Sequence, residues 1–407
     1  MTALQSTVDA PKCARKRTRI WFSFADPKEF SGQKAATLLV IDGLKSRCAE
    51  CKALPLPVLD RAAITHWELL RYAGRVLRSW IRSCVLLVQR GAWLHVSIGQ
   101  TRFAFLRDSV PLILGRIGMG RQRVVITLNG SLFMQWKPRS LNAKFFGALL
   151  RQAGTVTVLG RRQREQLIAL GVPTEAVQVV PNACDLQPLF SDEMQLKMSA
   201  VTKNGPIRLL YLSSLITTKG YPEYLDALLD LSGHPGQPIE AVLCGRLVAS
   251  EFSDRFTNLA EAEKWIEDQM AEINASSRVR VCWIRGAAGA EKAALYRAAD
   301  IFVLPTRYPV EAQPLVLVEA MATGCAIITT TVGEIKTILD EHTALFLPEA
   351  QPDALTASVT RLIEDHDERK RLASTAHARF LDKFQLSKHL DTWESIFGMA
   401  QRNIDYE

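Results

Sequence analysis

A strand, a loop and a helix follow one another in FVLPTRYPVEAQPLVLVEAMATGCAIITT, residues 302–330. The first apolar run ends at Pro305, Pro314 stands where a helix opens, and Gly324 follows the last helical turn. Proline at the start of a helix and glycine past its end is the usual asymmetry. The segment therefore predicts a strand, a helix and a second strand at 326–330.

The same alternation extends through most of the chain. Short apolar runs typical of buried strands occur at 20–24, 92–98, 124–128, 155–159, 177–181, 207–213, 239–244, 279–284, 301–305 and 326–330. Segments with apolar residues at helical spacing follow many of these runs. This order is typical of an α/β fold, in which a mostly parallel sheet carries helices on both faces.

A chain of 407 residues with 48% hydrophobic content is long enough for two such domains. Residues 191–206 have little apolar periodicity and several turn residues, so they are predicted to be the linker. The linker would separate an N-terminal domain, 19–190, from a C-terminal domain, 207–384. Residues 1–18 are polar and basic, and we expect them to be a mobile tail.

The two halves of the chain differ in charge. Residues 1–200 contain 29 Lys and Arg against 13 Asp and Glu, whereas the remainder contains 21 against 29. Such asymmetry points to an anionic partner on the basic side. No nucleic-acid-binding motif accompanies the charge, so nucleic acid is not expected to be that partner.

Residues 61–90 form a predicted basic amphipathic helix. Its apolar side chains are interleaved with five of the six arginines of this segment and include Trp67, Leu70, Val76, Leu77, Trp80 and Ile81. Two interpretations stay open. The helix suits an anionic membrane surface, and it equally suits packing of its apolar face into the domain core with solvated arginines.

The N-terminus lacks the apolar segment of a signal peptide, and no apolar run is long enough to cross a bilayer. We therefore expect a cytoplasmic protein, attached to the inner face of the membrane at most peripherally. The cysteines are scattered, and the CxxC pair of Cys48 and Cys51 has no companion ligands nearby. Neither a metal ion nor a cofactor is expected.

Two glutamates mark the candidate site. Glu319 lies in the middle of an apolar helix, where an ionised carboxylate is costly unless a partner satisfies it. Glu311 lies on the loop before that helix, whose first amides, near Leu315 and Val316, could hold a diphosphate. Alternatively, Glu319 forms a salt bridge with a core arginine and Glu311 is a solvated loop residue.

A lysine stands at a second helix opening. The strand at 207–213 leads into TTKGY, and Pro222 opens the next helix. Lys219 then lies at a helix N-terminus, and Gly220 permits a close approach of the backbone. Phosphate is the natural partner of such a lysine, although a solvated surface lysine fits the same pattern.

These motifs together resemble the retaining glycosyltransferases of family four. Glu311 and Glu319 are separated by seven residues, as in that family, and EAMATG follows. The segments LSSLITTKG and VVPNACDLQPLF and the strand that ends at Gly245 also match, so the resemblance covers about residues 155–350. It implies the GT-B fold, two facing Rossmann-like domains with the active site in the interdomain cleft, and a last helix, 385–407, that crosses back to the N-terminal domain.

The resemblance also implies roles for individual residues. Glu319 would bind the ribose hydroxyls of a nucleotide-sugar donor, Glu311 would bind the transferred sugar, and Lys219 would neutralise the diphosphate. Such an enzyme, a retaining hexosyltransferase, would act on a glycan or lipid-linked saccharide acceptor in polysaccharide or glycoconjugate biosynthesis. An anionic membrane surface would be a further partner of the basic domain.

Backbone groups complete the implied donor site, and the chain departs from the family at three places. The amides of Leu315 and Val316 would complete the phosphate cradle, and Gly245 would let the chain pass close to the nucleotide. An arginine five residues before the lysine is replaced by Ser214. The glycine pair of the first loop is reduced to Gly32 in SGQ, and the histidine after a later strand is replaced by Asn129 in TLNGS.

Asn129 and Gly130 are the predicted acceptor or sugar contacts, and Gly32 and Ser214 remain predicted donor contacts. An asparagine donates a hydrogen bond but cannot act as a base. Two other functions stay open. The chain could be a degenerate domain that binds a partner without catalysis, or a nucleotide-sugar epimerase on the same fold, although an epimerase needs acid and base residues.

Overall fold

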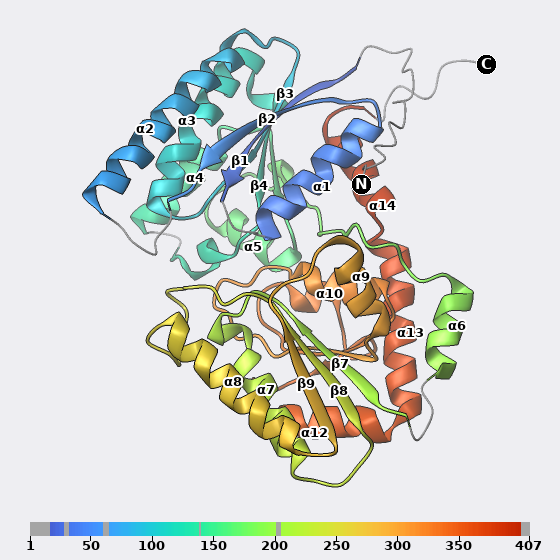
Figure 1. Cartoon of the computed structure of the whole chain (residues 1–407). Helices are drawn as coiled ribbons and strands as arrows, with labels where there is room; N and C mark the ends of the chain where they lie inside the picture. Colours follow the sequence, from blue (N-terminus) through green and yellow to red (C-terminus); the bar gives the residue numbers. More distant parts are fainter. Residues whose placement is uncertain (1–16, 28–31, 60–64, 138–139, 201–204, 400–407) are drawn as a thin grey trace, which may run out of the picture. The chain divides into compact units, whose positions relative to one another are not determined.

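The computed structural model describes residues 17–27, 32–59, 65–137, 140–200 and 205–399. These residues form two compact units (Figure 1). Unit 1 comprises the described residues up to Val180 together with those from Ser387 onward, and unit 2 is Pro181–Leu386. Residues 1–16 of the predicted tail lie outside the described residues.

In the described part of unit 1, six parallel strands form one sheet in the order β2-β1-β3-β4-β5-β6. The strands are β1 (Arg19–Asp26), β2 (Glu50–Pro57), β3 (Trp93–Ser97), β4 (Val124–Leu128), β5 (Thr155–Val158) and β6 (Val177–Val179). The helices are α1 (Gly32–Ser46), α2 (His66–Ser83), α3 (Arg102–Met119), α4 (Leu141–Leu150), α5 (Arg161–Ala169) and α14 (Leu386–Ile396), and the 3-10 helix η1 (Cys84–Val88) follows α2. Strand β4, VVITL, is buried throughout, as expected for a strand covered on both faces.

Strand β2 is the one strand of this sheet that the sequence did not predict. It lies at the edge and carries two prolines, Pro55 and Pro57. Proline cannot donate a ladder hydrogen bond, so it is found on edge strands. Most residues of β2 are also at least partly exposed, which removes the continuous apolar run that reveals a central strand.

Helix α14 joins unit 1 although it follows unit 2 in the chain. Arg47, which directly follows α1, donates a hydrogen bond of 2.9 Å to the carboxylate of Glu394. The ring of Trp393 lies edge-on to the buried ring of His95 on β3, with centroids 5.2 Å apart. An ion pair and an aromatic contact therefore fix the last helix to this sheet.

In the described part of unit 2, six parallel strands form a second sheet in the order β12-β11-β10-β7-β8-β9. The strands are β7 (Ile207–Leu212), β8 (Ile239–Cys244), β9 (Val279–Ile284), β10 (Ile301–Leu304), β11 (Ala326–Thr329) and β12 (Leu345–Phe346). The helices are α6 (Ser191–Ala200), α7 (Tyr221–Ser232), α8 (Leu259–Ala275), α9 (Gly289–Ala298), α10 (Leu315–Ala322), α11 (Ile335–Ile338), α12 (Pro352–Glu364) and α13 (His366–Lys383). The predicted α/β class is confirmed for both units.

The predicted linker at 191–206 is wrong. The chain passes from unit 1 to unit 2 between Val180 and Pro181, and helix α6 belongs to unit 2. Met194 of this helix is buried, and the Lys197 ammonium donates a 2.7 Å hydrogen bond to the carbonyl oxygen of Thr323. A helix held by few side chains shows little apolar periodicity, which is why the sequence pattern resembled a linker.

A buried ion pair anchors α3 in unit 1. The Arg107 guanidinium lies 2.6 Å from one carboxylate oxygen of Asp108, and both side chains are almost fully buried. The other oxygen accepts a 2.8 Å hydrogen bond from the amide of Gly99. The Arg107 guanidinium also donates to the carbonyl oxygen of Pro57. The pair therefore connects α3 to the ends of β2 and β3.

We expect Arg107→Met to destabilise unit 1 by about 3–5 kcal/mol, because it leaves the Asp108 carboxylate buried without its cation. Urea unfolding followed by circular dichroism measures the change. Arg161→Met is the control, since it removes an exposed pair with Glu165 and should cost less than about 1 kcal/mol. A cost at Arg107 no larger than at Arg161 would contradict the role of the buried pair.

Candidate active site

Two side chains that the sequence placed on separate loops meet at the carboxyl edge of the unit 2 sheet. Lys219 follows β7, and Glu311 follows β10. The Lys219 ammonium nitrogen lies 3.3 Å from a carboxylate oxygen of Glu311. Glu311 is only 8% exposed, so its interpretation as a solvated loop residue is wrong. The carboxyl edge is where open parallel sheets bind ligands.

The loop that carries Lys219 is held from three sides. Gly220 has a φ of 91°, in the left-handed region that favours glycine. A Cβ atom at this position would lie 2.4 Å from the carbonyl oxygen of Pro305. The buried Tyr211 hydroxyl donates to the carbonyl oxygen of Lys219, and the amide of Arg307 donates to that of Thr218. The loops after β7 and β10 therefore pack against each other.

An aromatic ring and an ion-pair network complete the surroundings of this loop. The Lys219 ammonium lies 5.0 Å from the ring centroid of Tyr308. Burial, together with the nearby Glu311, raises the pKa of Tyr308 to about 12. Arg307 pairs with Asp254, and its hydrogen bond is the main cause of the lowered pKa of that carboxyl. Sequence reasoning missed Tyr308 and Arg307, although both precede Glu311 on the same loop.

Glu319 has two partners on helix α9. A carboxylate oxygen lies 2.6 Å from the ammonium nitrogen of Lys292, and the other accepts a 2.9 Å hydrogen bond from the hydroxyl of Tyr296. Burial lowers the pKa of Lys292, but the adjacent Glu319 outweighs it and the pKa is raised. The alternative of a salt bridge is thus present, with a lysine in place of a core arginine. Lys292 and Tyr296 are four residues apart and therefore lie on one face of α9.

Helix α10 begins at Leu315, one residue after Pro314. The first amides of a helix have no partner inside it, so those of Leu315 and Val316 are suited to an anion. The loop before the helix is tied down, because the side-chain amide of Asn182 donates a 2.9 Å hydrogen bond to the carbonyl oxygen of Gln313. Gly324, with a φ of 64°, follows the helix as predicted.

Gly245 and Ser214 lie at the same edge of the sheet. Gly245 follows β8, and a Cβ atom there would lie 1.9 Å from the carbonyl oxygen of Ser213. No other residue fits this close approach without moving the backbone. The carbonyl oxygen of Ser214 accepts a 2.9 Å hydrogen bond from the amide of Ile216. The predicted contacts of unit 2 thus follow β7, β8 and β10, three neighbouring strands.

The predicted contacts of unit 1 lie at the carboxyl edge of its own sheet. The hydroxyl of Ser97, at the end of β3, accepts hydrogen bonds from the side-chain amides of Gln33 (2.8 Å) and Asn129 (3.2 Å). Gly32 is the first residue of α1. The carbonyl oxygen of Gly130 accepts a 2.8 Å hydrogen bond from Gln100. Sequence reasoning missed Ser97, and Ser31 of the SGQ motif lies outside the described residues.

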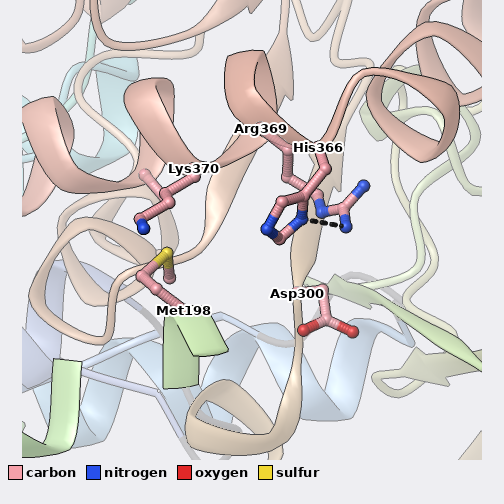
Figure 2. Close-up of a pocket in the computed structure, with 6 residues that line it drawn as sticks. Met198, Asp300, His366, Arg369 and Lys370 are labelled. Carbon is pink, nitrogen blue, oxygen red and sulfur yellow. Dashed lines mark hydrogen bonds between the residues drawn. The ribbon is translucent and has the colours of Figure 1, made fainter. Parts of the chain in front are cut away.

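A small pocket at the opposite, amino-terminal edge of the unit 2 sheet is not part of this site. Figure 2 shows His366 and Arg369 joined by a hydrogen bond of 2.9 Å, with Asp300 facing them. The Asp300 carboxylate accepts a 2.8 Å hydrogen bond from the amide of Arg208. Arg369 also donates to the carbonyl oxygen of Ile363. Each of these three side chains thus has a hydrogen-bond partner within the protein.

Residues 194–379, which contain the candidate site at the carboxyl edge of the unit 2 sheet, match the model of the family described as glycosyl transferases group 1. That match covers just under half of the chain. The D-inositol 3-phosphate glycosyltransferase of Corynebacterium urealyticum is 28% identical over 144 residues, which are 35% of this chain and 31% of that protein. The aligned region thus spans about a third of that relative.

Matches that extend beyond residues 194–379 have lower sequence identity. An uncharacterised glycosyltransferase of Methanocaldococcus jannaschii is 20% identical over 307 residues and covers 73% of each chain. The crystal structure of Anabaena HepE in complex with UDP and glucose has a TM-score of 0.67 at 16% identity, covering 94% of this chain and 100% of that one. With two parallel six-stranded sheets, this similarity confirms the predicted GT-B fold. The interdomain cleft stays a prediction.

We expect Lys292→Met to destabilise unit 2 by about 3–5 kcal/mol, because it leaves the Glu319 carboxylate buried and unpaired. The double variant with Glu319→Gln should recover most of the loss in a denaturant titration. The raised pKa of Lys292 means that the pair stabilises unit 2 fully below the ordinary lysine pKa of 10.5, and that this contribution is lost as the pH rises through the raised value.

The control is Lys264→Met, which removes an exposed ion pair with Asp268. It should change the denaturant concentration at the midpoint of unfolding very little. If Lys292→Met cost no more than this control, the Glu319 carboxylate would have to be satisfied without Lys292.

Proposed function

We propose that this protein transfers a sugar from a nucleotide-sugar donor to a glycan or lipid-linked saccharide, with retention of the anomeric configuration. The observation that carries the proposal is the buried Lys219–Glu311 pair beside the N-terminus of α10. The family of residues 194–379 supports it, and so does the likeness to a structure that holds UDP and glucose.

Lys219 and the first amides of α10 would stabilise the charge that develops on the diphosphate. The bond between the anomeric carbon and the diphosphate oxygen breaks, and the acceptor oxygen bonds to that carbon. The acceptor proton passes to the departing diphosphate. Charge stabilisation of this kind is usually the largest single contribution to catalysis, so the proposal requires neither a metal ion nor a side-chain base.

Carboxylates would orient the donor. Glu311 is placed to accept hydrogen bonds from the hydroxyls of the transferred sugar. Glu319 would accept those of the ribose, since a carboxylate has about four acceptor positions and Lys292 and Tyr296 occupy only two of them. Gly245 and Ser214 would lie along the nucleotide, and Gly32 would contact the donor from unit 1.

Asn129 separates the transferase from its alternatives. Its side-chain amide donates to Ser97 and leaves its carbonyl oxygen for a sugar or acceptor hydroxyl beside Gly130. An epimerase needs an acid and a base, and an amide supplies neither. A binding domain without catalysis would have no need to bury the carboxylate of Glu311 against a lysine.

The test is a panel of nucleotide sugars, with release of nucleoside diphosphate as the readout. We expect one donor to react, and we expect Lys219→Ala and Glu311→Gln each to lower kcat/KM by about 10²–10³-fold, as for loss of one charge-stabilising group. Glu319→Gln should act mainly through a higher KM for the donor. Glu272→Gln, on the exposed surface of α8, is the matched control and should retain full activity.

Product analysis distinguishes the three functions. A product in which the sugar is bonded to the acceptor with the anomeric configuration of the donor supports the transferase. A free epimerised sugar would support the epimerase. Binding of a donor, seen as a thermal shift, without turnover on any acceptor would favour the binding domain. No release and no shift with any nucleotide sugar would overturn the proposal.

A further inference from the structure

Helix α2 exposes a continuous row of large apolar side chains. Trp67, Leu70, Leu77 and Ile81 are each between 54% and 65% exposed. Their spacing, with Gly74 completing the row, alternates between three and four residues, which places them along one face of the helix. An exposed contiguous apolar surface of this kind marks an interaction site.

The core does not account for this row. On the opposite side of α2, Val76 and Ser83 are buried, and the indole of the half-buried Trp80 donates a 2.9 Å hydrogen bond to the carbonyl oxygen of Arg107. This narrow stripe attaches the helix to unit 1. The interpretation that the whole apolar face of the helix packs into the core is therefore wrong.

A row of arginines runs beside the apolar row. Arg71, Arg75, Arg78 and Arg82 are all exposed and again follow a spacing of three and four. Within the described ranges, no carboxylate lies within ion-pair distance of any of them. The one acid of the helix, Glu68, is used in the capping box with Thr65.

The neighbouring helix α3 carries an exposed apolar row of its own. Phe103, Leu106, Ile113 and Ile117 of α3 are exposed, and the half-buried Val110 between them completes a row spaced by three and four residues. Helices α2 and α3 lie side by side in unit 1 (Figure 1). Two adjacent helices thus each present an unpartnered apolar row, and the arginine row of α2 supplies positive charge beside them.

We propose that the α2–α3 face, defined by these eight apolar side chains and four arginines, docks on an anionic lipid bilayer. Apolar side chains enter the acyl boundary, while arginines pair with phosphate groups at the surface. A second copy of this chain fits less well, because a two-fold contact would bring the arginine rows of both copies together. None of the described helices has the length and apolar composition to cross a bilayer.

The test is co-sedimentation of the full chain with vesicles of phosphatidylcholine that contain or lack phosphatidylglycerol. We expect binding only to the anionic vesicles, weakened by added salt. We expect at least about a tenfold loss of apparent affinity in the double variant Arg75→Gln/Arg78→Gln, since each arginine near an anionic surface contributes roughly fivefold. We expect a loss of about the same size in Leu77→Ser/Ile81→Ser, because binding also depends on the apolar area that enters the bilayer. The fluorescence of Trp67 should shift to the blue on binding, and Trp67→Phe should abolish that shift.

Matched variants on unit 2 serve as controls. Lys370→Gln/Lys383→Gln removes the same charge, and Leu196→Ser removes an exposed leucine, so both should bind as the wild type does. Melting temperatures and light scattering are measured for each α2 variant. Values equal to those of the wild type would show that the variant is folded and keeps its oligomeric state. Equal binding by the α2 variants and the controls would overturn the proposal, as would a wild-type dimer that the α2 substitutions dissociate without lipid.

Discussion

A carboxylate that leaves water must find a cation or several hydrogen-bond donors, and two of the carboxylates that unit 2 buries, those of Glu311 and Glu319, lie only eight residues apart in the chain. Glu311 meets this constraint with Lys219, and Glu319 meets it with Lys292 and Tyr296. Each ion pair joins two elements that are distant in sequence. The loops after β7 and β10 and the helices α9 and α10 take their places because these charges have to be compensated.

The two pairs differ in how completely they are satisfied. Lys292 is 2.6 Å from Glu319, and a buried tyrosine holds the second oxygen of that carboxylate. Lys219 is 3.3 Å from Glu311 and keeps 19% of its side chain exposed. An ammonium group has three donors, so Lys219 can serve a second anion without leaving its carboxylate. The tight pair holds α9 against α10, whereas the looser pair leaves Lys219 able to bind a further anion.

The sequence predicted what depends on local pattern and missed what depends on packing. The buried strands were visible because strands such as β4 are apolar at every position. Strand β2 escaped notice because its prolines and exposure remove that signal. Glu311 and Lys219 could be named from their positions at helix openings, and Glu319 from its place in the middle of an apolar helix. Lys292 could not, since only the three-dimensional arrangement shows that α9 faces the carboxylate of Glu319.

Local pattern also fails where a helix is held by few contacts or none. Helix α6 resembled a linker because few of its side chains, among them Met194 and Lys197, attach it to unit 2. Helix α2 has strong apolar periodicity, which in a globular domain usually indicates a core face. The periodicity was real, but the exposed row and the buried stripe lie on different sides of the helix, and only accessibility separates them.

Helix α14 gives unit 1 a discontinuous chain, whereas unit 2 is one uninterrupted segment. During synthesis, all of unit 2 emerges from the ribosome before the residues that complete the aromatic packing around His95 and Phe22 are available. Unit 1 must therefore wait, with part of its core uncovered, until α14 and Phe397 are made. The order of synthesis makes the second unit the first one able to fold completely.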